Sequence, residues 1–201
     1  MSRIYCAGPL FNPAERREMD DIAEVLEAAG YTTFVPHRDG LEFARLLPEL
    51  QHIVPSVPAA DAVLRRAIFS LDVFQLLSRS DAVVANINGR VPDEGTVVEA
   101  ALAWFSGKAV VLYKNDSRSV LSGSDNPMLA ALGNFQVVTD ISELPQAVGR
   151  EIHVNHDDRV QNIIDVGRRI ADARDLSRES VTRTLVDLVS DSPTEGRRAK
   201  C

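Results

Sequence analysis

The sequence predicts an α/β protein built on a doubly wound, five-stranded parallel sheet with a C-terminal helical extension. Short β-branched runs alternate along the chain with segments that repeat apolar residues at helical spacing. Two of these runs, Ala82–Ala85 and Ala109–Tyr113, carry small and β-branched residues without polar alternation. Such runs are typical of strands that helices cover on both faces, and the alternation of strand and helix indicates parallel strands.

The N-terminal part of the chain contains two strand–helix units. Its strands and helices are expected at Ile4–Cys6, Pro13–Ala29, Thr32–Val35 and Ala60–Ser78. The last helix places one apolar face along Val63, Ala67, Leu71, Phe74 and Leu77. The segment Asp39–Ala59 has three prolines and no clear period, so we expect an irregular flap or lid over the site.

The next elements complete the sheet. They are expected at Ala82–Ala85, Thr96–Ser106, Ala109–Tyr113, Pro127–Leu132, Phe135–Val138 and Ser142–Arg150. In such sheets ligands bind beyond the carboxyl ends of the strands, so chemistry is expected in the loops that follow them. These loops contain neither G-x-G-x-x-G nor a P-loop, which argues against a dinucleotide or a nucleoside triphosphate.

Three parts of the chain are predicted from its composition. Residues 1–150 form the α/β domain, and two amphipathic helices over 151–189 form the extension. The sequence leaves open whether these helices pack on the domain or build an oligomer interface. Residues 190–201 have few apolar side chains and are expected to be disordered.

Charge and composition exclude several classes of function. The net charge of -7 and a pI near 5.1 disfavour nonspecific binding to a nucleic-acid polymer. The two cysteines, Cys6 and Cys201, lie at opposite ends and match neither a disulfide framework nor a metal site. No run approaches the ~20 apolar residues of a membrane span, nor does the N-terminus read as a signal peptide. We therefore expect a cytoplasmic protein without a membrane partner.

The segment from Asp93 to Glu99 is the most informative stretch, because it follows a strand and opens a helix. It places two carboxylates at the edge of the sheet where ligands bind. Considered alone, Thr96 and Glu99 have the T-x-x-E spacing of a capping box, which would make Glu99 structural. Asp93 would then be a loop residue that the helix dipole favours.

Three segments resemble the nucleoside 2-deoxyribosyltransferase family. They are Ile4-Tyr5-Cys6-Ala7-Gly8-Pro9, the stretch from Asp72 to Asn86, and D-x-G-T-x-x-E from Asp93 to Glu99. The resemblance covers roughly residues 3–148, with the segments in the same order and at matching spacing. It implies a flavodoxin-like fold and an enzyme that exchanges the nucleobase of 2'-deoxyribonucleosides, without a cofactor or metal. Its partners would be a deoxynucleoside donor and a nucleobase acceptor, as in nucleoside salvage.

The resemblance implies that Glu99 is the nucleophile. A carboxylate with an ordinary pKa of about 4.3 is ionised at neutral pH and can attack C1' without a separate base. A second attack by the acceptor base then gives net retention, as in retaining glycosidases. Hydrolysis of nucleosides or their 5'-monophosphates is the nearest alternative. A non-catalytic nucleotide-sensing module is the rival from another class.

Other roles also follow from the resemblance. Asp72 and Asp93 would contact and protonate the base, for which one of them needs a raised pKa. Tyr5 would orient Glu99 through its hydroxyl. Gly8 and Pro9 would shape a loop that lets the sugar approach the backbone. Simple surface exposure of Asp72 and simple core packing of Tyr5 are the alternatives.

Asn126-Pro127-Met128 resembles the family's N-x-M segment, which a neighbouring subunit contributes to the pocket for the sugar's 5'-hydroxyl. Asn126 and Met128 are therefore expected to bind substrate in a homo-oligomer whose sites lie near subunit interfaces. Ser122 and Ser124 lie close enough to leave a 5'-phosphate open as the group bound. His37 and Arg38 follow the second strand and are expected to lie on the surface, with contact to the base or sugar as the alternative.

Overall fold

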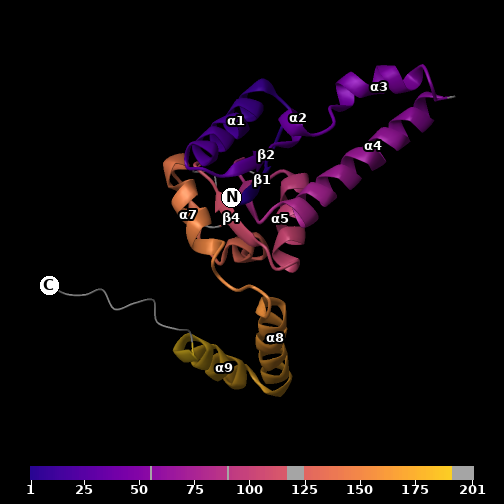
Figure 1. Ribbon diagram of the computed structural model, residues 1–201. Helices are drawn as coiled ribbons and strands as arrows, with labels where there is room; N and C mark the ends of the chain where they lie inside the picture. The colour runs from indigo at the N-terminus through magenta and orange to yellow at the C-terminus, as the bar shows by residue number, and fades with distance from the viewer. Residues whose placement is uncertain (55, 90, 117–124, 192–201) are drawn as a thin grey trace. The chain divides into compact units, whose positions relative to one another are not determined.

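Figure 1 shows the computed structural model of the chain, which describes residues 1–54, 56–89, 91–116 and 125–191. The chain divides into two compact units, Met1–His156 and Asp157–Cys201. Ser122, Ser124 and residues 192–201 of the predicted tail lie outside the described residues.

A five-stranded, all-parallel sheet forms the centre of the first unit. Its strands are β1 Arg3–Ala7, β2 Thr32–Phe34, β3 Ala82–Asn86, β4 Ala109–Tyr113 and β5 Val137–Val138. The order β2-β1-β3-β4-β5 confirms the predicted doubly wound, flavodoxin-like arrangement. The strand order reverses beside β1, so the loops after β1 and β3 border the expected ligand-binding edge.

Seven helices follow the strands in the described part of this unit. They are α1 Pro13–Ala28, α2 Pro36–Asp39, α3 Phe43–Gln51, α4 Val57–Phe74, α5 Glu94–Phe105, α6 Pro127–Ala130 and α7 Leu144–Glu151. A π-helical turn, Gln75–Arg79, continues α4 towards β3. Short 3-10 turns span Ala131–Gly133 and Ile141–Glu143.

The two faces of the sheet carry separate apolar cores. Because side chains alternate along a strand, Ile4 and Cys6 point to one face, and Tyr5 and Ala7 to the other. On the first face α1 and α7 cover the strands. On the second face the cover comes from α5, the π turn and α6. Cys6 is a free, fully buried thiol, and burial raises its pKa to about 12.

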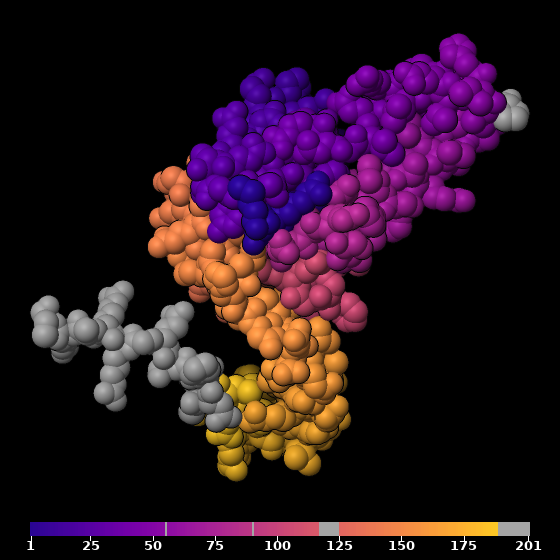
Figure 2. Space-filling view, in the orientation of Figure 1, coloured from indigo at the N-terminus to yellow at the C-terminus, as the bar shows by residue number. Residues whose placement is uncertain are grey.

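Two expectations about the secondary structure of the first unit are wrong. The segment expected to be an irregular flap contains the helix α3, with Pro48 inside it, and the start of α4. Figures 1 and 2 show α3 lying along α4, where the Arg65 guanidinium covers the Phe43 ring. The fifth strand is shorter than expected, because Asn134 and Phe135 both adopt positive φ angles, 53° and 58°, that a strand does not allow.

The second unit is a pair of helices, α8 Arg159–Leu176 and α9 Arg178–Asp191. Ser177 separates them, and its hydroxyl accepts a hydrogen bond from the Ser180 backbone N–H at the start of α9. Several large apolar side chains of the pair are exposed: Ile163, Ile164, Leu176, Leu185 and Val186. None of the described helices of the chain is both long and apolar enough to cross a membrane.

Candidate active site

The side chains of Tyr5 and Glu99 meet on the second face of the sheet. Tyr5 is fully buried in β1, and its hydroxyl donates a hydrogen bond of 2.6 Å to Oε1 of Glu99 on α5. Burial, followed by the negative charges of Glu99 and Asp72, raises the pKa of Tyr5 far above its usual value. Tyr5 therefore remains a donor at every physiological pH, and it fixes one oxygen of the carboxylate.

The N-terminus of α5 shows that Glu99 is not a capping residue. Asp93 is the N-cap, and its Oδ2 accepts hydrogen bonds from the backbone N–H and the hydroxyl of Thr96, at 2.7 and 2.9 Å. The helix thus begins at Glu94, and Glu99 lies beyond its first turn. The capping box considered for Thr96 and Glu99 is therefore wrong, and Glu99 is free to face Tyr5.

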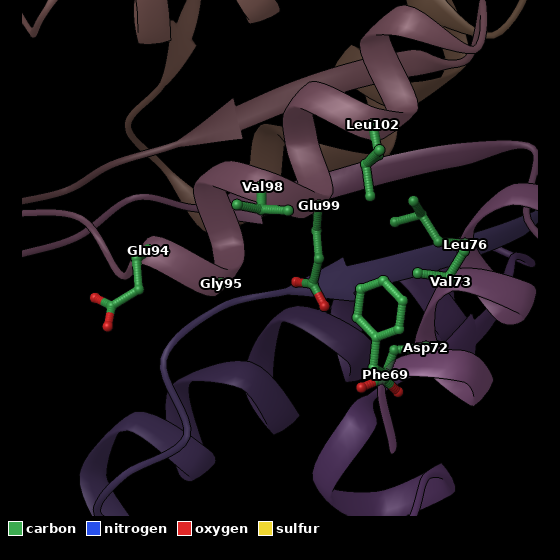
Figure 3. Close-up of a pocket in the computed structure, with 9 residues that line it drawn as sticks. All are labelled: Phe69, Asp72, Val73, Leu76, Glu94, Gly95, Val98, Glu99 and Leu102. Atoms are coloured by element: carbon green, nitrogen blue, oxygen red, sulfur yellow. The ribbon is translucent and has the colours of Figure 1, made fainter. Parts of the chain in front are cut away.

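Glu99 points into a pocket of about 260 Å³ between the two helices α4 and α5 (Figure 3). Its apolar wall consists of Phe69, Val73, Leu76, Val98 and Leu102. The polar groups at the pocket are the carboxylates of Asp72, Glu94 and Glu99, and Gly95 completes the lining. A largely apolar pocket that holds a few placed carboxylates is the usual form of a small-molecule site.

Asp72 faces Glu99 across this pocket (Figure 3). Within the described part of the chain, no group forms a hydrogen bond or an ion pair with its carboxylate. Burial raises the pKa of Asp72 to about 6. The surface position considered for Asp72 is thus wrong, and a carboxyl group with this pKa can hold a proton near neutral pH.

The environment of Glu99 also changes its acidity. Burial raises the pKa of Glu99 to about 7, assisted by the charges of Asp72 and Asp93 and opposed by the hydrogen bond from Tyr5. The sequence-based expectation of an ordinary, fully ionised carboxylate is therefore wrong. At pH 7 about half of the Glu99 side chains carry the charge that nucleophilic attack requires.

Close packing requires a glycine at position 8, in the loop after β1. A Cβ atom on Gly8 would lie 2.2 Å from Sδ of Met19, on α1, and 3.2 Å from Cβ of Asn86. Gly8 thus lets the loop lie directly against α1. Pro9 does not line the Glu99 pocket; it borders a second, polar cavity together with Glu18 and Asn88.

Asn126 and Met128 lie outside the pocket that contains Glu99. Asn126 is the N-cap of α6 and accepts a hydrogen bond from the Met128 backbone N–H at 2.9 Å. The Met128 side chain is 81% exposed, so it can be reached from outside the subunit. His37, predicted to be a surface residue, is instead largely buried and contacts Asp20 of α1 at 2.9 Å.

Of the nine residues that line the pocket, the sequence predicted only Asp72 and Glu99 as site residues, and Phe69 is the aromatic one among those missed. It lies with Asp72, Val73 and Leu76 at the spacing i, i+3, i+4, i+7, which is one face of a helix. The apolar face predicted for this helix is a different one, and its members Val63 and Phe74 are 51% and 45% exposed. The spacing relative to Asp72 was the signal that could have found Phe69.

Within the described ranges, no three His, Cys, Asp or Glu side chains are grouped so that they could share a metal ion.

Comparison with known proteins identifies the family. The sequence model for nucleoside 2-deoxyribosyltransferase matches residues 4–164, which is most of the chain. The chain belongs to the nucleoside 2-deoxyribosyltransferase family. This is a family of deoxyribosyltransferase enzymes that act on nucleosides and nucleobases. None of the curated protein sequences matched the chain.

Solved structures share the fold of this deoxyribosyltransferase-family chain. A conserved protein from Enterococcus faecalis V583 is 20% identical, with a TM-score of 0.58 over 75% of this chain and 98% of the other. A 2-deoxyribosyltransferase from Bacillus psychrosaccharolyticus is 21% identical, with a TM-score of 0.54 over 72% of this chain and 90% of the other. At these identities the likeness establishes the fold.

Proposed function

We propose that this protein transfers 2-deoxyribose between nucleobases through a covalent adduct on Glu99. The observation that carries the proposal is the 2.6 Å hydrogen bond from Tyr5 to Glu99 beside a pocket that also holds Asp72. Tyr5 occupies Oε1 of Glu99, while no group of the described residues bonds to Oε2. One oxygen is thus positioned, and the other is free to attack a sugar carbon.

The reaction consists of two displacements at C1' of the sugar. Glu99 Oε2 forms a bond to C1' as the bond from C1' to the base nitrogen breaks, and the base leaves with the electron pair of that bond. An acceptor base then attacks C1' through its ring nitrogen, gives the proton of that nitrogen back to the Asp72 carboxylate, and releases the Glu99 carboxylate. Because each step inverts C1', the product has the configuration of the donor. The reaction needs no metal or cofactor.

Asp72 is the better placed of the two aspartates to protonate the departing base. Its carboxyl group lines the pocket, has no hydrogen-bond partner in the described part of the chain, and has a pKa raised to about 6 by burial. Asp93 instead uses one oxygen to cap α5 and does not line the pocket. We therefore assign Asp93 the role of holding the helix that carries Glu99.

Asn126 and Met128 enter the proposal through a neighbouring subunit. Both lie outside the Glu99 pocket of their own chain, and Met128 is 81% exposed. We propose a homo-oligomer in which these two residues reach the sugar end of the adjacent site, while Gly8 and Pro9 shape the loop beside it. Coexpressed Glu99→Ala and Asn126→Ala subunits should then regain activity that each variant lacks, since some mixed sites hold both wild-type residues. Absence of recovery would assign the site to one chain.

The proposed function is tested by chromatography of products. Purified protein is incubated with deoxyinosine or thymidine, with and without adenine or cytosine, beside a Glu99→Ala variant. We expect a new deoxynucleoside that forms only with the acceptor base and only when Glu99 is present. Mass spectrometry of protein quenched without acceptor should detect one added deoxyribosyl group, which the variant lacks.

Two other outcomes identify the alternatives. Free base without exchange, from nucleosides or from their 5'-monophosphates, would mean that water is the acceptor and that the protein is a hydrolase. Binding of these compounds without any turnover would mean a non-catalytic sensing module. Tyr5 and Glu99 count against the sensor, because a binding module has no need of a positioned nucleophile.

A further inference from the structure

Phe69 is an exposed aromatic ring at the mouth of the Glu99 pocket. Its side chain is 64% exposed, although Phe69 lines the pocket together with Asp72 and Glu99. Figure 3 shows the ring beside Asp72 and across the pocket from Glu99. An aromatic side chain that loses so little contact with water contributes little to folding, and the position of Phe69 at the pocket makes its ring available to a ligand.

Phe11, Phe105 and Phe135 are also exposed, by 82%, 70% and 67%, but none of them lines the pocket. Arginine side chains lie over Phe34, Phe43 and Phe74, at 5.0 to 5.6 Å from the ring centres. Among the described residues, neither a cation nor another ring lies against Phe69. A planar ligand that stacks on Phe69 would therefore displace neither a cation nor another ring of the described residues.

The neighbours of Phe69 limit what such a ligand can be. The rest of the apolar wall consists of the aliphatic side chains of Val73, Leu76, Val98 and Leu102, so Phe69 supplies the aromatic surface of the pocket. Asp72 lies one turn along the same helix face and can exchange hydrogen bonds with the edge of a planar ring. A flat heterocycle with polar edges fits these two side chains together.

We propose that Phe69 is the platform on which the nucleobase stacks, and that it determines how strongly purines are favoured over pyrimidines. The inference rests on the proposed function and names a base-binding residue for it. Stacking on Phe69 places the edge of the base at Asp72 and the glycosidic bond towards Glu99. The larger ring system of a purine gains more from this contact than a pyrimidine does.

Steady-state kinetics of Phe69 variants test the proposal. Phe69→Ala should raise KM for deoxyinosine about 10-fold, with a smaller increase for thymidine. The value of kcat should change less than KM, because the stacked base is held in the bound substrate as well as in the transition state. Phe69→Tyr should restore KM, and Phe69→Leu should not, since leucine keeps apolar area without an aromatic face.

Phe105→Ala is the matched control, because Phe105 is 70% exposed on α5 and does not line the pocket. Three results would overturn the proposal: equal kinetics for Phe69→Ala and Phe105→Ala, full activity of Phe69→Leu, or an altered oligomer mass for Phe69→Ala. The last result would assign the ring to a subunit contact.

A binding measurement separates this inference from the proposed function. Calorimetric titration of deoxyinosine into Glu99→Gln and into Glu99→Gln/Phe69→Ala needs no turnover. We expect about a 10-fold weaker Kd for the double variant. If wild type turns over no nucleoside but the two Kd values differ, the proposed function fails and the stacking role stands. Equal Kd values, or no binding to either variant, contradict the stacking role.

Discussion

The two faces of the central sheet differ in what their covering helices do. On one face α1 and α7 bury Ile4 and Cys6 under apolar side chains such as Leu26, which is 0% exposed. On the other face α5 and the end of α4 also cover the strands, but they separate around the pocket that contains Glu99. One step along β1, from Tyr5 to Cys6, passes from the pocket face to the closed face.

Side chains alternate in direction along each strand. The same strand therefore contributes residues to a closed core on one face of the sheet and residues to the candidate site on the other. Substitutions on the closed face should reduce the free energy of unfolding and leave the kinetics of the folded protein unchanged. Substitutions on the pocket face should change kinetics, and some of them should increase stability. The first three of the four experiments below compare a residue on the pocket face with a matched residue elsewhere, and the fourth follows the pH dependence of the pocket itself.

Glu99→Gln should give the largest effect, a loss of kcat by at least about 10³-fold, because an amide cannot form the adduct. The same variant should be more stable at pH 8, by about 1–3 kcal/mol. The folded-state pKa of about 7 lies above the ordinary value, so wild type loses stability as the pH rises from about 4.5 to 7.

Thermal unfolding at pH 5 and pH 8 measures this gain, which should be larger at pH 8. Glu24→Gln, at an exposed position of α1, is the control and should show no such dependence. A Glu99→Gln variant that is less stable than wild type at pH 8 would contradict the raised pKa.

Leu26→Ala should give the largest loss of stability, about 2–5 kcal/mol, because it leaves a cavity in the closed face. Below its melting temperature the variant should keep the wild-type KM and kcat. Leu76→Ala makes the same chemical change at a buried residue that lines the pocket, so it should reduce stability and also raise KM. A changed KM in Leu26→Ala would break the division between the faces.

Tyr5→Phe should reduce kcat about 10- to 100-fold near pH 6.5 while the fold is retained, because the ring and its stacking on Phe34 remain. The lost hydrogen bond lowers the pKa of Glu99 in wild type, so the acid limb of the pH–rate profile should move to higher pH. Tyr31→Phe, which removes a hydroxyl bonded to the Pro145 carbonyl, is the control. If the acid limb of the Tyr5→Phe profile stays at the wild-type pH, Tyr5 contributes to packing and does not change the pKa of Glu99.

The smallest expected effect concerns the dependence of the wild-type rate on pH, which should be bell-shaped. Attack requires ionised Glu99, with a pKa of about 7, and protonation of the base requires protonated Asp72, with a pKa of about 6. Because both carboxyls face one pocket, the observed values belong to the pair, with a maximum between about pH 6 and 7. Asp72→Asn should remove the alkaline limb. A persistent limb in that variant would assign the proton to another group.

The fold could be predicted because the amino-acid composition of the strands indicates that both of their faces are buried. Ala82–Asn86 and Ala109–Tyr113 are wholly buried, as their apolar, unalternated sequences indicate. The helix α3 was missed because it is short and contains Pro48 in a segment with two further prolines. Its apolar residues Phe43, Leu46, Leu47 and Leu50 nevertheless follow the i, i+3, i+4, i+7 spacing of one helix face, which is the signal that could have found it.

The parts of the candidate site that lie in short sequence motifs could be predicted. The parts that depend on how distant helices pack together could not. The resemblance of two short motifs to the family implied that Tyr5 orients Glu99, and the structure brings the two together. The sequence could not distinguish Asp93 from Thr96 as the cap of α5, since both residue types are good N-caps three positions apart. Nor could it give the acidity of Glu99, which depends on burial between helices far apart in sequence.

The π-helical turn at Gln75–Arg79 makes this segment more tolerant of a loss of length than of a gain. A π turn holds one residue more than an α turn, and it connects α4 directly to the run before β3. Deleting one residue there should convert it to an α turn and keep the helix face that carries Phe69 and Asp72 at the pocket. Inserting a further residue, which the turn cannot absorb, would rotate the upstream helix by about 100° relative to the sheet. Phe69 and Asp72 would then leave the pocket together, although neither had been replaced.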